Sequence, residues 1–399
     1  MFSYRHTWAQ ISLDAIGANI RSFQALLRPG IRLMAVVKAD AYGHGAIPVA
    51  RAALAAGATH LGVAFLDEAL QLRLAGIGAP ILILGYTPPA SVIAAVEHDI
   101  AITVISSETL DALEAAVRTI GKKAKLHLKL DTGMTRLGTA SAEEAWTLLR
   151  RIQANPLLEL EGVFTHFADA DNLDSAYTRK QFALFGEMLQ TMRIHGTEKV
   201  LRHCCNTAAT LLYPDMHLDM VRVGVGLYGL YPIAEARTRT RLIPAMRFCT
   251  TIAALKHVPQ GQAISYGCTF QPAKDSLIAV MPVGYADGLP RQLSNRGHVL
   301  VRGVRVPIVG TVCMDQTMLD VSAIPGLLPG EEVTLFGQDP LGPPLGAAEW
   351  AVLMNSIHYE VVCGIGKRVP RVYESEGSIL EGNNALLAQP PGSSFPASS

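Results

Sequence analysis

Eight short apolar segments separated by helical patterns fill the first half of this chain, and this alternation constrains the fold more than any other feature. Amphipathic stretches such as 66–75 and 107–120 lie between them, and one more helix is predicted over 14–27. Eight strands alternating with helices predict an α/β fold, a (β/α)8 barrel. A doubly wound open sheet is the alternative, because a count of strands does not show closure. The strands are predicted at 33–37, 61–64, 81–84, 101–104, 125–130, 160–165, 201–204 and 221–225.

The pattern changes after residue 232, where short β-rich runs are separated by Gly and Pro turns. Helical periodicity persists only over 346–357, so a second, mainly β domain is predicted. The segment 8–13 alternates like a strand and is expected to pair with that domain. The β-rich runs are 247–258, 277–283, 298–308, 317–322 and 332–336.

These patterns define expected domain boundaries. The barrel is predicted over 9–235, and the mainly β domain over 1–8 together with 236–375. Residues 376–399 carry Gly, Asn, Pro and Ser with few bulky side chains, which predicts a disordered tail.

The composition argues against several classes of protein. With 399 residues and 49% hydrophobic content, the chain can bury a large core. The 34 basic and 34 acidic residues balance, so nothing favours nucleic acid or an acidic membrane as a partner. No apolar run is long enough to span a membrane, and the first six residues lack the apolar core of a secretion signal. The six cysteines include no Cys-x-x-Cys pair, which predicts free thiols in a reducing cytoplasm.

The first barrel strand ends abruptly in a lysine, within the segment Ala35-Val-Val-Lys-Ala-Asp-Ala-Tyr-Gly-His-Gly45. A buried strand that delivers Lys38 at its end is a plausible arrangement for a Schiff base. Desolvation favours the neutral amine, which is the form that attacks an aldehyde. Pyridoxal phosphate needs such a lysine.

Further polar residues follow the other predicted strands, and active sites of barrels lie at the carboxyl ends of the strands. Phosphate sites in such barrels often follow strands seven and eight, where Thr207 supplies a hydroxyl and Gly224 and Val225 supply backbone N–H groups. The polar residues at these ends are Lys38, Lys129, Asp131, Arg136, Thr165, His166, His203, Asn206, Thr207 and Arg222.

Each residue also has an ordinary structural explanation. His166 suits a hydrogen-bonded core histidine, and Arg136 suits a surface ion pair. Thr207 suits a helix N-cap, which is compatible with binding phosphate. In the second domain, Tyr266 between serine and glycine suits a turn, and Met314 suits a core position. The conjunction of the residues at the strand ends favours a functional site.

Taken together, these segments resemble the alanine racemase family from about Trp8 to Tyr373, in the order that the family has them. The resemblance implies pyridoxal phosphate as cofactor, a barrel followed by a β domain, and a head-to-tail homodimer. It also implies that each active site combines the barrel of one subunit with the β domain of its partner. The expected substrate is alanine, and no metal is expected.

The resemblance also implies roles for individual residues. Lys38 matches the cofactor lysine and one catalytic base, and Tyr266 from the partner matches the base on the opposite face. Arg222 matches the arginine at the pyridine nitrogen, which keeps that nitrogen unprotonated because arginine retains its own proton. Arg136 and Met314 match the residues that bind the substrate carboxylate. The remaining matches are His166 and Asn206 around the cofactor; Tyr42, Thr207, Gly224, Val225 and Tyr359 at its phosphate; and Lys129, which is carbamylated in some members.

Two positions depart from the family pattern. Thr207 stands where serine is common, and it keeps the hydroxyl. The segment His203-Cys204-Cys205-Asn206 is richer in cysteine than usual, which bears on local packing.

Other functions on the same fold stay open from the sequence. A decarboxylase would place a carboxylate at the pyridine nitrogen, which Arg222 argues against. A metal-assisted aldolase would need a ligand cluster in the second domain, and no close His-x-Cys pair is found there. A serine or broad-specificity racemase differs by one side-chain oxygen of the substrate. A non-catalytic pyridoxal-phosphate-binding protein would lack the second domain. Whether the enzyme supplies D-alanine for peptidoglycan or degrades it is not encoded in these patterns.

Overall fold

The computed structural model describes residues 4–193 and 200–387, which form two compact units. One unit is Ala15–Ile243, and the other joins Met1–Asp14 to Pro244–Ser399. The boundaries therefore fall a few residues later than the predicted ones at 8 and 235. In the described part of the chain, no helix is both long enough and apolar enough to cross a membrane.

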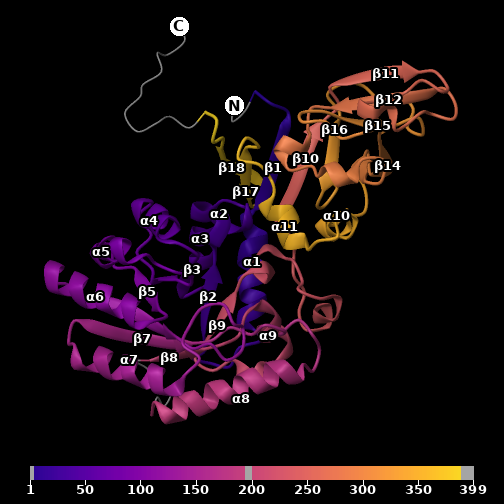
Figure 1. Ribbon diagram of the computed structural model, residues 1–399. Helices are drawn as coiled ribbons and strands as arrows, with labels where there is room; N and C mark the ends of the chain where they lie inside the picture. Colours follow the sequence, from indigo (N-terminus) through magenta and orange to yellow (C-terminus); the bar gives the residue numbers. More distant parts are fainter. Residues whose placement is uncertain (1–3, 194–199, 388–399) are drawn as a thin grey trace, which may run out of the picture. The chain divides into compact units, whose positions relative to one another are not determined.

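The first unit is a parallel eight-stranded barrel (Figure 1). Each strand pairs with its neighbour in the order β8-β7-β6-β5-β4-β3-β2-β9. The backbone N–H of Asp219 bonds to the Arg202 carbonyl at 3.1 Å, and that of Arg222 to the Cys205 carbonyl at 3.0 Å. These two bonds link β9 to β8, so the barrel prediction is confirmed over the open sheet. The strands are β2 (Arg32–Val36), β3 (His60–Val63), β4 (Ile81–Ile83), β5 (Ala101–Val104), β6 (Ala124–Lys129), β7 (Leu158–Phe164), β8 (Leu201–His203) and β9 (Met220–Val223).

Helices between the strands begin where a polar side chain satisfies an open backbone N–H. Ser106, Ser141 and Ser175 accept hydrogen bonds at the starts of α6, α7 and α8. The predicted helices over 66–75 and 107–120 are confirmed as α4 and α6. The helices of this unit are α1 (Leu13–Gln24), α3 (Ala46–Ala55), α4 (Leu66–Leu74), α5 (Val92–Glu97), α6 (Ser107–Ile120), α7 (Ala142–Ala154), α8 (Ala176–Thr191) and α9 (Thr207–Leu212).

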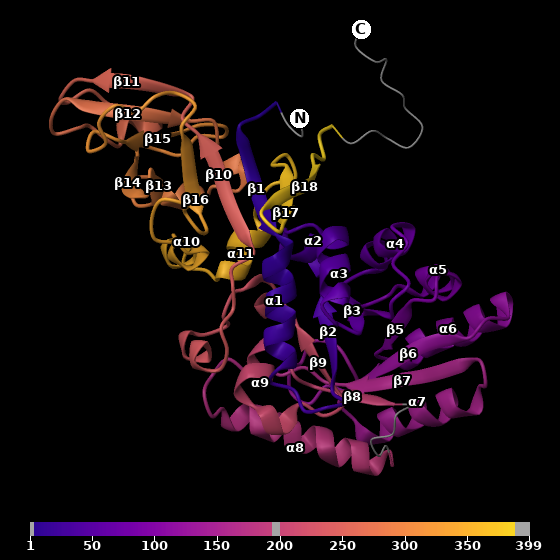
Figure 2. The same ribbon diagram turned by 180° about the vertical axis from the view of Figure 1, so that it is seen from behind.

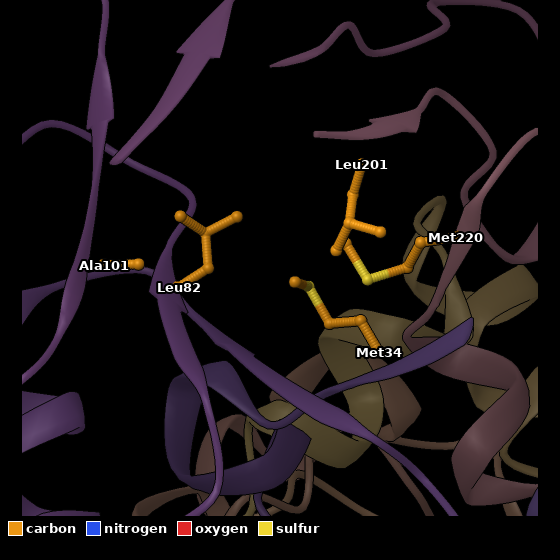
Figure 3. Close-up of a cluster of buried hydrophobic side chains, with 5 residues drawn as sticks. All are labelled: Met34, Leu82, Ala101, Leu201 and Met220. Atoms are coloured by element: carbon orange, nitrogen blue, oxygen red, sulfur yellow. The ribbon is translucent and has the colours of Figure 1, made fainter. Parts of the chain in front are cut away.

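The barrel interior is layered. A cluster of buried apolar side chains from five strands meets inside it (Figure 3). Side chains two residues apart on a strand share a face. His203 therefore follows Leu201, and Arg222 follows Met220, on the next layer toward the strand ends. The apolar cluster consists of Met34, Leu82, Ala101, Leu201 and Met220.

The second unit is a mainly β domain around one ten-stranded sheet, seen from behind in Figure 2. Its order is β11-β12-β15-β14-β13-β16-β10-β1-β17-β18. The amino-terminal strand pairs antiparallel with β10 and parallel with β17, as predicted for the segment 8–13. The elements are β1 (Thr7–Ser12), β10 (Met246–Thr251), β11 (Ala254–Val258), β12 (Ser276–Met281), β13 (His298–Val301), β14 (Val304–Val309), β15 (Thr317–Asp320), β16 (Glu332–Phe336), α10 (Ala347–Met354), α11 (His358–Cys363), β17 (Arg371–Ser375) and β18 (Ser378–Asn383).

The prediction of a disordered tail from residue 376 is wrong for its first part. β18 pairs antiparallel with β17, starting at a tight turn around Gly377 (φ 72°). Its side chains are mostly exposed, so the sequence shows no apolar alternation there. The rest of the predicted tail, from 388, lies outside the described residues.

Gly162 on β7 lies directly beside the His127 ring, where there is no room for a side chain. A Cβ on Gly162 would lie 2.4 Å from Nδ1 of His127. We predict that Gly162→Ala lowers the free energy of unfolding by about 1–3 kcal/mol, because the ring must move. In α8, Gly186→Ala is the matched control, since nothing lies within 4 Å of its Cβ position. There we expect a gain of about 0.4–1 kcal/mol. Urea unfolding measures both, and equal stabilities would contradict the prediction.

Candidate active site

Lys38 stands at a strained turn directly after β2. The segment α2 (Lys38–Tyr42) is not a right-handed helix, because Ala39, Asp40, Ala41 and Tyr42 have φ values of 52–53°. Residues other than glycine rarely adopt this left-handed conformation, and each costs about 1–2 kcal/mol. Four in a row persist only where surrounding contacts hold them, which is a hallmark of functional sites. The Lys38 side chain itself is exposed at the end of the strand.

The carboxylate of Glu68 fastens this turn. Its Oε1 accepts the backbone N–H of Ala39 at 2.7 Å, and its Oε2 accepts that of Ala64 at 2.6 Å. The ends of β2 and β3 are thereby joined through one side chain. Glu68 is not among the residues predicted from the sequence, although an acidic residue in the first turn of a helix that follows a barrel strand is an available signal.

A small polar cradle forms where β9 ends. Thr207 Oγ1 accepts the backbone N–H of Gly224 at 2.9 Å and that of Gly226 at 3.5 Å. A Cβ on Gly224 would lie only 2.6 Å from the Tyr42 hydroxyl, so this glycine admits the tyrosine. The structure thus brings Tyr42, Thr207, Gly224 and the adjoining Val225 together. The Thr207 hydroxyl, which accepts these N–H groups, keeps its own hydrogen to donate, and a hydroxyl donor at the end of a barrel strand fits the phosphate group of pyridoxal phosphate.

Asn206 has a structural function here. Its Oδ1 accepts the backbone N–H of Ala209 at 2.9 Å and caps α9. Its predicted contact with a cofactor remains a prediction.

The guanidinium of Arg222 is buried, with 4% of the residue exposed. It donates to His203 Nδ1 at 2.9 Å, to His166 Nδ1 at 3.2 Å, and to the carbonyls of Thr165 and Cys204 at 2.9 and 3.1 Å. All four acceptors that the described part of the chain provides are uncharged. Burial lowers the pKa of Arg222 to about 10, so the group remains a cation and a donor at neutral pH. Such a donor fits an unprotonated pyridine nitrogen.

Both histidines beside Arg222 are neutral. Burial lowers the pKa of His166 and of His203 well below the ordinary value, and the positive charge of Arg222 lowers each further. His203 also stacks on Phe164, with ring centroids 4.8 Å apart. His203 is predicted at a strand end without a role, and in the structure it accepts a hydrogen bond from Arg222 directly.

Lys129 is buried at the end of β6, with 4% exposed. Its Nζ lies 5.4 Å from the centroid of the Phe164 ring. Burial lowers its pKa to about 8, and the positive charges of Arg136 and Arg222 contribute. The loop that carries Arg136 is held by Asp131, whose carboxylate accepts the backbone N–H groups of Gly133 and Arg136 at 2.9 and 3.2 Å. Arg136 itself is exposed.

Three predicted site residues belong to the mainly β unit. Tyr266 and Met314 are exposed by 73% and 52%. Their loops are joined, because Thr311 Oγ1 donates to the Tyr266 carbonyl at 2.8 Å, and Ser265 Oγ donates to the Thr311 carbonyl at 2.6 Å. Tyr359 lies on α11. The three are therefore placed within their own unit only.

A buried carboxylate supports the Met314 loop. Asp287 pairs with Arg5 and with Arg368, the latter at 2.7 Å. Arg368 also contacts Asp315 at 2.5 Å. The backbone N–H of Ala286 bonds to the Met314 carbonyl at 3.1 Å. The exposed methionine thus rests on a rigid base.

Comparison with known proteins identifies the family. The model of the alanine racemase N-terminal domain matches residues 11–232, and that of the C-terminal domain matches 245–373. Alanine racemase 1 of Oceanobacillus iheyensis is 52% identical over 374 residues, covering 93% of this chain and 99% of that protein. Alanine racemase of Desulfovibrio desulfuricans is 48% identical over 369 residues, covering 92% and 98%. The chain belongs to the alanine racemase family.

Solved structures of the family agree with this assignment. Alanine racemase of Bacillus anthracis has a TM-score of 0.89 at 40% identity, covering 96% of this chain and 99% of that one. Alanine racemase of Clostridium difficile has a TM-score of 0.92 at 37% identity, covering 96% and 100%. The resemblance inferred from the sequence is confirmed, and the protein is a racemase.

Lys129 of this racemase should make folding pH-dependent. Below pH 8 it is protonated in the folded and the unfolded chain, and the fold bears a buried cation. Above pH 8 the folded state releases the proton, while the unfolded lysine holds it up to about pH 10.5. The unfolded state then binds more protons, so stability rises with pH, by up to about 1.4 kcal/mol per unit.

Urea unfolding in CO2-free buffers at several pH values tests this prediction. Lys129→Met is the comparison, because it keeps the volume and removes the titration. The stability of the wild type relative to this variant should rise above pH 8. A difference that is flat over this range would contradict the lowered pKa.

Proposed function

We propose that this protein interconverts L-alanine and D-alanine with pyridoxal phosphate as cofactor. The observation that carries the proposal is the buried cation of Arg222 on β9, beside the strand that delivers Lys38. Relatives named alanine racemase at 48–52% identity over nearly their whole length support the substrate. A location in the cytoplasm, where the described cysteines stay free, is part of the proposal, and the enzyme would either supply D-alanine for peptidoglycan or degrade it.

The residues present suit the cofactor. When bound, pyridoxal phosphate withdraws electrons from the α-carbon of an amino acid, which makes the α-proton removable. Lys38 would hold it covalently, and Arg222 would donate a hydrogen bond to its ring nitrogen. Tyr42, Thr207 and the backbone of Gly224 and Val225 would hold its phosphate. Tyr359 is proposed as a further phosphate ligand, with His166 and Asn206 among the cofactor's surroundings.

Two bases on opposite faces of the substrate are the simplest way to invert a centre. We assign these roles to Lys38 of one protomer and to Tyr266 of the partner subunit. Arg136 and the backbone N–H of Met314 of the partner subunit would bind the substrate carboxylate. The exposure of Tyr266 and Met314 supports a homodimer with shared sites, since both side chains are presented rather than packed within their unit.

Arg222 limits the electron withdrawal. A guanidinium with a pKa of about 10 donates a hydrogen bond at neutral pH but does not protonate the ring nitrogen. Electron withdrawal then stays moderate, which favours prompt return of the proton at the α-carbon over side reactions.

Purified protein with added pyridoxal phosphate should racemise L-alanine, as followed by circular dichroism. L-serine is the competing substrate, and we expect a lower kcat/KM for it. Lys38→Ala should reduce the rate by at least about 10³-fold, since a covalent base is lost. Glu159→Gln is the control, because Glu159 lies at the start of β7, away from the carboxyl ends of the strands. A higher kcat/KM for serine would overturn the substrate assignment, and no turnover of either would overturn the function.

Shared sites predict recovery of activity between two inactive variants. Lys38→Ala and Tyr266→Phe proteins are each expected to be nearly inactive. After subunit exchange, each heterodimer should have up to about half the activity of a wild-type dimer, because one of its two sites has both bases intact. Mass spectrometry of the intact dimer verifies the exchange. Heterodimers that form without recovering activity would contradict sharing.

A further inference from the structure

The buried Arg222 cation has only neutral acceptors around it, so its nearest negative charge must lie farther away. Arg222 donates to His203 Nδ1, and His203 in turn contacts a second histidine. His203 Nε2 lies 2.9 Å from His127 Nδ1, and His127 Nε2 lies 3.9 Å from Oε2 of Glu161. The series leads from the arginine through two buried rings to a carboxylate.

The direction of each hydrogen bond follows from the chemistry of the first member. A guanidinium only donates, so His203 Nδ1 accepts and its Nε2 carries the proton. That N–H donates to His127 Nδ1, which places the His127 proton on Nε2, facing Glu161. Burial lowers the pKa of His127 to about 3 and keeps the ring neutral. For both His203 and His127, only the tautomer with the proton on Nε2 is compatible with these hydrogen bonds.

The backbone of β7 is adapted to bring the carboxylate to this place. Along the pairing of β6 with β7, Leu126 faces Leu160, but His127 faces Gly162. Glu161 is therefore the extra residue of a β-bulge, a device that redirects a side chain. Gly162 then leaves room for the ring, since a Cβ there would lie 2.4 Å from His127 Nδ1.

Glu161 is partly exposed and has a second cation beside it, at the end of the barrel opposite the predicted active site. Its Oε1 lies 4.0 Å from Nζ of Lys125, and a quarter of its side chain is exposed. A cavity of about 890 Å³ at the strand starts is lined by Glu161 together with Arg32, His60 and Glu159. Burial raises the pKa of Glu161 above its usual value, the carboxylates of Glu159 and Asp99 add to this, and the cations of Lys125 and Arg32 offset it in part. The partial exposure and the two cations favour the ionised carboxylate.

We propose that Glu161, at the end of the barrel opposite the catalytic face, is a positioning residue of the racemase. Its carboxylate, 3.9 Å from His127 Nε2, attracts the Nε2–H of the tautomer that the hydrogen bonds from Arg222 also require, and it thereby helps to orient the two rings that hold the Arg222 guanidinium. The inference rests on the proposed function, because Arg222 is assigned to the ring nitrogen of the cofactor. Glu161 touches neither substrate nor cofactor.

Nitrogen-15 resonances of labelled histidine in the holoenzyme test the series directly. Both His127 and His203 should carry the proton on Nε2 in the wild type. Glu161→Gln removes the charge with almost no change of shape, and it should shift the Nε2–H resonance of His127 and, less, that of His203. Glu159→Gln is the matched control, because it removes the same charge from the same strand and cavity without facing His127. It should leave both resonances unchanged.

Kinetics separate positioning from a purely structural role. We expect Glu161→Gln to lower kcat for alanine about two- to thirtyfold with KM nearly unchanged, and Glu161→Ala to lower it at least as much. Glu159→Gln should match the wild type. A proton on Nδ1 of His127, or unchanged His203 resonances and kcat in both Glu161 variants, would overturn the proposal. A wild type that does not racemise alanine would refute the proposed function instead, and the resonances would still decide the series.

Discussion

The burial of the Arg222 guanidinium is the constraint on which the rest of the site depends. An uncompensated charge inside a barrel is expensive, and its loss of water must be offset by well-placed acceptors. Four uncharged acceptors surround it, one from β8 and three from the residues that follow β7 and β8. Because guanidinium cannot accept a hydrogen bond, it dictates the protonation of each ring beside it. Arginine at this position therefore supplies a positive charge and also requires each neighbouring ring nitrogen to accept a hydrogen bond.

The other half of the site depends on backbone strain. The left-handed turn after β2 places Lys38 beyond the strand end, and Glu68 ties that turn to β3. Gly224 performs the complementary task on β9, where the missing side chain admits the Tyr42 hydroxyl. Short strands of a closed barrel bring these features together, although they are far apart in the sequence. The chemistry is thus built from rigid strand ends rather than from long loops.

Much of this architecture could be predicted from the sequence, for physical reasons. Strands of a parallel barrel are buried on both faces, so each appears as a continuous apolar run. β18 was not predicted because its side chains are mostly exposed. α11 was not predicted because a helix of six residues shows little periodicity. His127 and Glu161 were missed because a β-bulge changes which residues face each other, and alternation along the strand does not reveal it. Residue types at strand ends were enough to predict Lys38 and Arg222 as site residues, but not the side chains that contact the turn after Lys38 or the Arg222 guanidinium.

The central claim is that a protonated Arg222 donates to an unprotonated ring nitrogen of the cofactor. The most direct test is the nitrogen-15 chemical shift of holoenzyme reconstituted with pyridoxal phosphate labelled at the ring nitrogen. We expect the wild-type holoenzyme to show the shift of an unprotonated, hydrogen-bonded pyridine throughout the neutral pH range. In an Arg222→Glu variant the shift should move toward that of a pyridinium, since a carboxylate stabilises that proton. A pyridinium shift in the wild-type enzyme would contradict the account.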